Sequence, residues 1–154
     1  MAGLKSDLVL MTSHVAQFFL KDSEWNAMLK AASEALNSGG YILFDSRRSL
    51  PESFQKWPTK EARRTVVDPK EGKIEYWVEL IETTDKLGRY KLHYFFTETG
   101  DQVISEDAII FRTKEEILSS LENAGFIIET IYGDWDASKY NETSPEMIFL
   151  ARRN

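Results

Sequence analysis

The side chains that can exchange a proton near neutral pH are few, because the 154 residues include two histidines, His14 and His93, and no cysteine. The absence of cysteine excludes thiolate zinc sites, iron–sulfur clusters and cysteine nucleophiles. The two histidines are far apart and show no H-x-x-x-H spacing, so the sequence predicts no metal site. Thr12, Ser13 and His14 form a polar break directly after an apolar run, where a parallel strand would end and where ligands bind in such sheets.

Composition limits the class of protein. The chain is 42% hydrophobic and 29% charged, with a formal net charge of −6, which is typical of one globular domain. The acidic balance and scattered basic residues argue against nucleic-acid binding, which needs clustered Lys and Arg. No apolar run approaches the roughly 20 residues of a membrane span, and no secretory signal is visible, so a cytoplasmic location is expected.

The first third of the chain predicts half of a doubly wound α/β unit. Residues 7–11 are a compact run of apolar, partly branched residues, which favours an interior strand buried on both faces. A helix begins near Ser23, with Asp22 or Ser23 as its cap, and carries apolar residues at helical spacing. Gly39 and Gly40 are expected to end it, and residues 41–44 form a second buried strand.

The middle and the end of the chain have different patterns. Residues 73–84, 89–97 and 102–111 alternate as consecutive antiparallel strands, joined by hairpins that each contain a glycine available for positive φ. The sequence at 113–116 is a capping box that begins a helix ending at Gly125, and residues 127–132 and 147–151 are the last strands. We therefore predict a single domain over residues 1–154, with an α/β sheet core from residues 1–48 and 113–154 and an antiparallel β insertion from residues 64–112.

Five segments in this order resemble class I S-adenosylmethionine-dependent methyltransferases. They are Asp7-Leu-Val-Leu-Met-Thr-Ser-His14, the helix containing Trp25, Leu36-Asn-Ser-Gly-Gly40 with its following strand, Leu121-Glu-Asn-Ala-Gly-Phe126, and Tyr132-Gly-Asp-Trp-Asp136. The resemblance extends from about Asp7 to Arg152 and implies the C-terminal half of a Rossmann-like sheet, beginning at the fourth strand of the family. The antiparallel insertion resembles the lid over the substrate in many small-molecule members.

The resemblance also implies roles for particular residues. In the family, the junction after the fourth strand lies near the methyl group and the substrate. His14 is therefore a candidate general base, and Thr12 and Ser13 are candidate cofactor contacts. The alternative interpretation is that His14 only caps or packs against the following turn. For His93, which lies in an alternating strand, a structural or surface role is expected.

Substrate-binding candidates are Arg47, Trp77, Tyr94 and Trp135. Arg47 follows the second strand of the α/β unit and can face an anionic substrate, although surface ion pairing is the commoner role of such a residue. The two aromatic residues of the insertion can line a pocket or can fill a core. Trp135 can shape a substrate entrance or belong to an ordinary turn after a strand.

The departure from the family is the missing front half, because the sequence contains no G-x-G turn for close approach of backbone to the cofactor. S-adenosylmethionine is the cofactor that the resemblance implies, for small-molecule methyl transfer only if a partner or assembly completes its site. The alternative is a non-catalytic dimeric binding or interaction module derived from a methyltransferase, and a third option is a different small-ligand binding protein. The exposed strand edge at Asp7–Met11 predicts either a homodimer through that edge or a separate chain that supplies the missing half.

Overall fold

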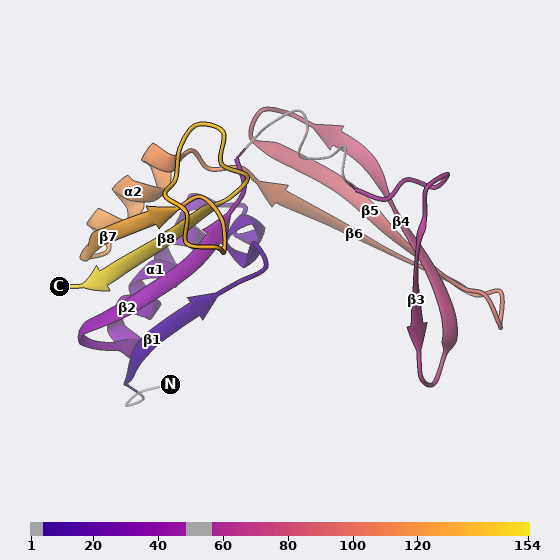
Figure 1. The fold of residues 1–154 in the computed structure, drawn as a ribbon, viewed down its shortest axis with the longest axis horizontal. Helices are drawn as coiled ribbons and strands as arrows, with labels where there is room; N and C mark the ends of the chain where they lie inside the picture. The colour runs from indigo at the N-terminus through magenta and orange to yellow at the C-terminus, as the bar shows by residue number, and fades with distance from the viewer. Residues whose placement is uncertain (1–4, 49–56) are drawn as a thin grey trace. The chain divides into compact units, whose positions relative to one another are not determined.

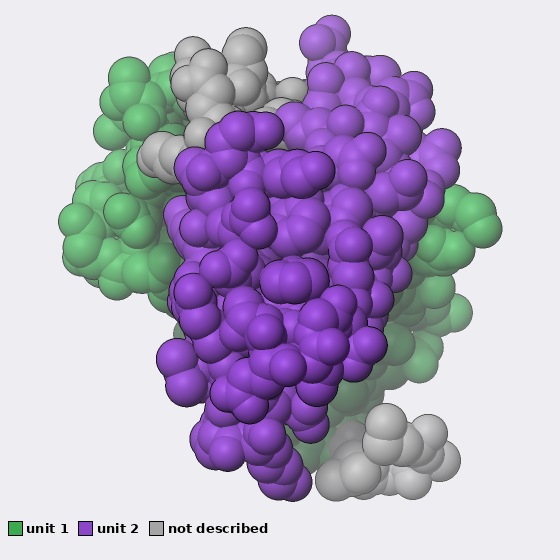
Figure 2. All heavy atoms as spheres, turned by 90° about the vertical axis from the view of Figure 1, so that its right-hand side faces the viewer, with its two compact units in different colours: residues 1–49, 110–154 green, residues 50–109 purple. Residues whose placement is uncertain are grey.

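The computed structural model describes residues 5–48 and 57–154. It divides the chain into two compact units, coloured separately in Figure 2: unit 1 is formed by residues 1–49 and 110–154, and unit 2 by residues 50–109. Whether residues 1–154 fold as one domain stays a prediction. Among the described residues, no helix is long and apolar enough to cross a membrane.

Unit 1 is a four-stranded sheet with helices on one side (Figure 1). Its strand order is β1 (Ser6–Met11), β2 (Leu36–Ser46), β8 (Met147–Arg153) and β7 (Phe126–Tyr132). β1 and β2 are parallel and are connected through the short 3-10 helix η1 (Val15–Phe18) and the helix α1 (Asp22–Ala35), whereas β8 is antiparallel to both of its neighbours. The predicted α/β sheet, with its final antiparallel pair, is confirmed.

The core of unit 1 lies between this sheet and two helices, α1 and α2 (Lys114–Asn123). Trp25 of α1 packs edge-on against Phe44 of β2 at 5.5 Å between ring centroids, and Phe44 stacks on Phe149 of β8 at 5.2 Å. Leu29 and Leu121 are fully buried beside them. Burial of such large apolar side chains is the main stabilising contribution to a unit of this size.

The position of β1 differs from the prediction. Within residues 5–48 and 57–154 it is an edge strand that pairs with β2 alone, and its burial alternates, with Val9 and Met11 packed against the core while Leu8 and Leu10 are 47% and 56% exposed. The prediction of an interior strand buried on both faces was therefore wrong. A compact apolar run does not distinguish a strand with two buried faces from one whose second face is apolar and open.

The ends of α1 also differ from the prediction. The helix begins after Lys21, without a side-chain cap, so Asp22 lies in its first turn instead of capping it. It ends at Ala35, and extended backbone at Leu36 starts β2 at once. The positive φ of Gly39 is used inside β2, where the register with β1 shifts, and not at the helix terminus.

Unit 2 contains the strands β3 (Arg64–Asp68), β4 (Gly72–Thr83) and β5 (Leu87–Phe96), followed by β6 (Gln102–Ile110) at the boundary of the unit. These strands are neighbours in chain order, as expected of the predicted antiparallel insertion. β3 was not predicted as a separate strand. Gly88 pairs with Thr83 without a positive φ, so the expected role of that glycine in the hairpin was wrong, whereas Gly100 has φ +79° as predicted.

The C-terminal elements agree with the sequence patterns. Thr113 accepts a hydrogen bond from the backbone N–H of Glu116, whose carboxylate accepts from the backbone N–H of Thr113, and α2 follows. Gly125 has φ +84° just beyond the helix end, the conformation for which glycine is favoured there. β7 then begins at Phe126, so capping box, helix end and strand were all predicted.

Candidate functional site

The candidate site is a cluster in unit 1 at the ends of strands, formed by His14, Asp45, Arg47 and Glu146. β1 ends at Met11, and the chain then turns through Ser13 and His14, which have φ values of 61° and 60°. Left-handed backbone at two consecutive non-glycine residues is unusual and is found preferentially at functional sites. This turn directs His14 toward residues at the end of β2 and just before β8.

The backbone and the ring of His14 are both held. Its backbone N–H donates to Asp45 Oδ1 at 2.9 Å, and its carbonyl accepts from the backbone N–H of Gln17 in η1. Its ring Nε2 is 2.9 Å from Glu146 Oε2 and 3.7 Å from Asp45 Oδ2. The guanidinium of Arg47 lies against the same ring, with Nη2 2.8 Å from Nδ1 and Nε 3.2 Å from Nε2.

One tautomer of neutral His14 satisfies the two shortest ring contacts. A carboxylate only accepts and a guanidinium only donates, so Nε2–H donates to Glu146 at 2.9 Å while Nδ1 accepts from Arg47 Nη2 at 2.8 Å. In this tautomer Nε2 does not accept from Arg47 Nε, which lies 3.2 Å away. Asp45 is 1% exposed and accepts a hydrogen bond from the backbone N–H of His14. The imidazole is therefore fixed in orientation by groups from two other segments, residues 45–47 and Glu146, a common requirement of a positioned acid or base.

A divalent cation is the other occupant that these residue types suggest. One donor atom each from His14, Asp45 and Glu146 lie within 4.8 Å of one another. The position of Arg47 argues against a metal ion here. A metal bound at His14 Nε2 would leave the proton on Nδ1, and this N–H would then face the guanidinium of Arg47, which is itself a hydrogen-bond donor. The contacts therefore fit a hydrogen-bonded ion-pair network better than a metal centre.

Sequence reasoning found His14 and Arg47 but missed Asp45 and Glu146. These carboxylates are 31 and 132 residues from His14, so no local spacing connects them with it. Asp45 did carry a signal, since it follows the apolar residues 41–44 in a strand whose carboxyl end lies beside that of β1. Glu146 had no such signal in the sequence, because its position beside His14 depends on the path of the loop between β7 and β8.

The other predicted contacts of unit 1 lie on its surface. Thr12 and Ser13 are exposed beside His14, where their roles as cofactor contacts stay predictions. Arg48 donates to the backbone carbonyl of Glu142, and its Nη2 is 3.3 Å from the Glu142 carboxylate, which links the end of β2 to the loop between β7 and β8. Trp135, in that loop, is 53% exposed and stays a candidate substrate contact.

The predicted aromatic contacts Trp77 and Tyr94 belong to unit 2. Trp77 is buried and stacks on His93 at 4.8 Å with the rings 7° from parallel, and Tyr94 lies opposite Tyr76 on the neighbouring strand. His93 is also buried, with Nε2 2.8 Å from Glu79 and Nδ1 3.0 Å from the Gln102 amide. Trp77 thus contributes to the interior of the strand layer, and a role of either aromatic residue toward a substrate stays a prediction.

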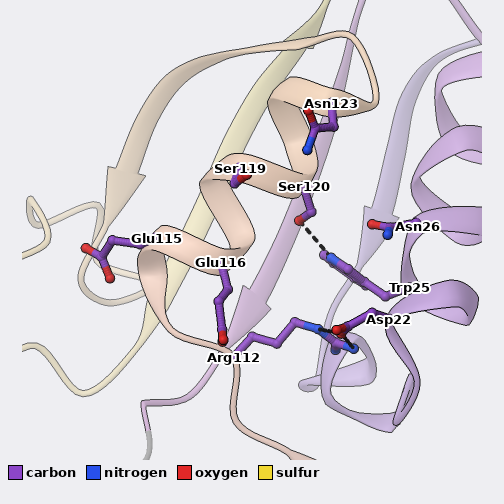
Figure 3. A pocket seen from close by; sticks show the side chains of 9 residues that line it. All are labelled: Asp22, Trp25, Asn26, Arg112, Glu115, Glu116, Ser119, Ser120 and Asn123. Carbon is purple, nitrogen blue, oxygen red and sulfur yellow. Dashed lines mark hydrogen bonds and ion pairs between the residues drawn. The ribbon is translucent and has the colours of Figure 1, made fainter.

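A cavity of about 440 Å³ lies between α1 and α2, away from the His14 cluster (Figure 3). Arg112 forms the floor of this cavity and is buried. Its guanidinium donates to Asp22 and to the backbone carbonyl of Phe19. The guanidinium carbon lies 5.3 Å from the centroid of the Trp25 ring. The indole N–H of Trp25 donates to Ser120 at 2.8 Å. These contacts tie the start of α1 to α2, so the polar floor of the cavity has a structural explanation.

Comparison with known proteins identifies the fold. No family model and no curated protein matches the sequence. Solved structures do match: an S-adenosylmethionine-dependent methyltransferase from Clostridium acetobutylicum has 17% identity and a TM-score of 0.80, covering 100% of this chain and 61% of its own. A sugar N-methyltransferase from Streptoalloteichus sp. has 18% identity and a TM-score of 0.73, covering 100% of this chain and 58% of its own.

An amino pentose methyltransferase from Micromonospora echinaspora, solved with S-adenosylmethionine bound, has 16% identity and a TM-score of 0.67, covering 100% of this chain and 61% of its own. The chain therefore spans about three fifths of the length of the structures it matches. At these identities the likeness shows the fold, which is the Rossmann-like α/β fold of methyltransferases with an added antiparallel layer.

Proposed function

We propose that this chain is part of an S-adenosylmethionine-dependent methyltransferase that acts on a small molecule, and that polypeptide outside these 154 residues completes the cofactor site. The observation that carries the proposal is the His14 cluster. A strained turn at the carboxyl end of a parallel strand presents an imidazole, and residues from two other segments hold it. Ligands bind at this edge in sheets of this kind.

His14 supplies the proton acceptor in this proposal. An acceptor amine or hydroxyl loses a proton when it is methylated, and a neutral imidazole takes that proton while a carboxylate stabilises the imidazolium. Glu146 at 2.9 Å is placed for that stabilisation. Arg47 occupies Nδ1, so this nitrogen becomes available when the guanidinium turns toward an anionic group of the substrate.

The residues of this chain do not by themselves fit the whole cofactor. When bound, S-adenosylmethionine supplies an activated methyl group, but its binding in this fold needs backbone that approaches closely at a glycine-rich turn. The eight glycines of the sequence form no G-x-G, and the described glycines with positive φ are in the β1–β2 register shift, two hairpins and a helix end. The dependence on further polypeptide follows from this disagreement.

Calorimetric titration tests the proposal. We expect no micromolar binding of S-adenosylmethionine or S-adenosylhomocysteine to the 154-residue chain alone. We expect binding when the chain is mixed with the two fifths of the Clostridium acetobutylicum structure that lie outside the matched region. Micromolar binding by the chain alone would contradict the incomplete site, and a well-formed mixed complex that binds neither compound would contradict the methyltransferase assignment.

A second candidate function is a non-catalytic binding module of the same fold. The missing glycine turn favours it, and so does the engagement of both ring nitrogens of His14 inside the protein.

A screen of methyl acceptors separates the two candidate functions. Amines on sugars are the first acceptors to screen, because two of the matched structures are named as methyltransferases of such compounds. Methylation of any acceptor that is lost in His14→Ala would exclude the module.

A further inference from the structure

Arg47 is the cation of the His14 cluster, and its charge has no carboxylate partner within the described parts of the chain. Its guanidinium makes hydrogen bonds with the ring of His14 alone. Among the other arginines of unit 1, one donates to a backbone carbonyl and three have carboxylate partners: Arg153 with Leu36, Arg48 with Glu142, Arg112 with Asp22 and Arg152 with Glu129. A half-buried guanidinium that is held by a neutral ring keeps its capacity to bind an anion.

The same contact blocks His14 as a proton acceptor. In the tautomer with the proton on Nε2, the free lone pair of the ring is on Nδ1, which already accepts from Arg47 Nη2 at 2.8 Å. A proton delivered to Nδ1 would place an N–H against a guanidinium that only donates, and two cations would then lie at hydrogen-bond distance. His14 can therefore take up a proton at Nδ1 only after the guanidinium has moved away from the ring.

The other contacts of the cluster do not involve Arg47 and suit the ring once the guanidinium has moved. Glu146 Oε2 is 2.9 Å and Asp45 Oδ2 is 3.7 Å from Nε2 of His14. Two carboxylates beside the imidazole favour its protonated form. The backbone N–H of His14 donates to Asp45, which holds the turn independently of Arg47. Removal of the guanidinium from the ring thus converts a blocked imidazole into a positioned base.

We propose that Arg47 is the receptor for an oxyanion, a carboxylate or a phosphate, carried by the methyl acceptor, and that this anion draws the guanidinium away from His14 and frees Nδ1. The inference rests on the proposed function and deepens it by naming the class of acceptor, an amine or hydroxyl compound with an anionic group close to the atom that is methylated. The anionic group must be close, because the guanidinium that binds it starts in contact with the ring. Among amines on sugars, those with a carboxylate or phosphate beside the amine are the expected acceptors.

This arrangement links the choice of acceptor to the proton transfer. The acceptor nitrogen or oxygen bonds to the methyl carbon of S-adenosylmethionine while the carbon–sulfur bond breaks and leaves S-adenosylhomocysteine, and the proton that the acceptor loses passes to Nδ1 of His14. A neutral acceptor leaves Arg47 on Nδ1 and finds this proton acceptor blocked. An anionic acceptor exposes it, so part of the binding energy of the anion raises the rate of the chemical step as well as the affinity.

The test is a titration of the 154-residue chain, labelled with nitrogen-15 in its histidines, with inorganic phosphate and separately with acetate. Chloride keeps the ionic strength constant, and the pH is one at which His14 is neutral. We expect saturable changes in the ring signals of His14 that reproduce the spectrum of Arg47→Met, while the signals of His93 stay unchanged. In Arg47→Met neither anion should move His14. The anion that binds more tightly identifies the group that the acceptor carries.

Two further variants complete the titration. Arg152→Met removes a guanidinium that is already paired with Glu129 at 2.8 Å, and it should leave the anion affinity within twofold of the unmodified chain. Arg47→Lys keeps the charge but loses the planar fork that binds an oxyanion through two hydrogen bonds, so the anion should bind about fivefold more weakly. Arg47→Lys also provides the comparison in case Arg47→Met does not fold.

Two results would overturn the inference. One is no response of His14 to either anion in the unmodified chain, and the other is an unchanged anion affinity in both Arg47 variants. Failure of the proposed function is a different result. An anion response in the chain, followed by a completed enzyme that methylates no acceptor, supports the anion receptor and contradicts methyl transfer. Methylation of neutral acceptors as fast as of anionic ones supports methyl transfer and contradicts the receptor.

Discussion

His14 depends on its neighbours for orientation, and this gives the site a property that can be measured directly. The two shortest contacts of the ring are with an acceptor, Glu146, 2.9 Å from Nε2, and a donor, Arg47 Nη2, 2.8 Å from Nδ1, so its neutral form has the proton on Nε2. The same geometry keeps Nδ1 directed at the guanidinium. This assignment of the proton to Nε2 follows from the donor and acceptor types of the neighbouring groups and not from the fold.

Nitrogen-15 spectra of the imidazole report this tautomer. At a pH where His14 is neutral, we expect the shift pattern of an Nε2–H ring. In Arg47→Met, the Nδ1 contact is lost and the pattern should move toward the mixture seen in free imidazole. A dominant Nδ1–H form in the unmodified protein would contradict the described network, and the spectrum of His93 in the same sample serves as an internal control.

At this scale the sequence predicts only part of the site. His14 was found because it follows an apolar run, and Arg47 because it follows the next predicted strand. Asp45 and Glu146 reach the ring through the pairing of β1 with β2 and β2 with β8, which no local pattern contains. The exposed Thr12, Ser13 and Trp135 stay predictions that need a bound ligand to test.

Among the elements, α2 has the most clearly encoded start. Thr113 and Glu116 satisfy each other's backbone N–H groups at 3.1 Å and 2.9 Å. Thr113→Ala removes one of these partners and should lower the free energy of unfolding by about 1 kcal/mol. Urea denaturation measures the change, with Ser119→Ala on the exposed side of α2 as control. Equal stability of the two variants would contradict a stabilising cap.

The hairpin between β3 and β4 has a carboxylate that organises its turn. The backbone N–H groups of Glu71 and Lys70 donate to Asp68 and hold the pKa of that carboxyl below its ordinary value of 3.8. A lowered folded-state pKa means that the stabilisation is fully present above the ordinary value and is lost as the pH falls through the lowered one. The hairpin is therefore expected to loosen only in strong acid.

An NMR titration of the Asp68 carboxyl carbon checks this, with a midpoint expected below 3.8. Asp68→Ala should speed hydrogen exchange at the amides of Lys70 and Glu71 at neutral pH. Glu71→Ala keeps the same backbone donors and is the matched control. A midpoint at or above the ordinary value would show that the turn does not depend on this carboxylate.

The strands and helices of the sheet core were predictable because each has a period or a cap of its own. Errors occurred where burial depends on neighbours absent from the local pattern. Residues 7–11 contain the same apolar residues whether one face or two are covered, and only the structure shows that Leu8 and Leu10 are exposed. Likewise, the alternation along residues 73–84 does not show which face is covered: Leu80 is exposed, and the buried residue of β4 is Trp77, on the opposite face.

For the whole molecule, the two units differ greatly in core size. The described core cluster lies in unit 1, whereas the buried apolar side chains described in unit 2 are Trp77 and Ile109. A unit with so small a core is not expected to be stable alone. We therefore expect one cooperative thermal transition by calorimetry, in line with the predicted single domain, and two well-separated transitions would contradict it.

The comparisons also belong to this scale. The matched structures show the fold over all 154 residues, and the chain spans about three fifths of their length. The sequence shows that the G-x-G turn is missing, but the strand order β1-β2-β8-β7 required the structure, because it joins strands that are distant in sequence.

The most direct test of the central claim is methyl transfer from labelled S-adenosylmethionine to amino sugars by the chain together with the completing polypeptide. We predict turnover by the mixture, a loss of about 10²- to 10⁴-fold in His14→Ala with cofactor affinity within twofold, and no loss in the exposed α1 control Lys30→Ala. Turnover that is unchanged in His14→Ala, or a complex that binds the cofactor and methylates nothing, would contradict the account.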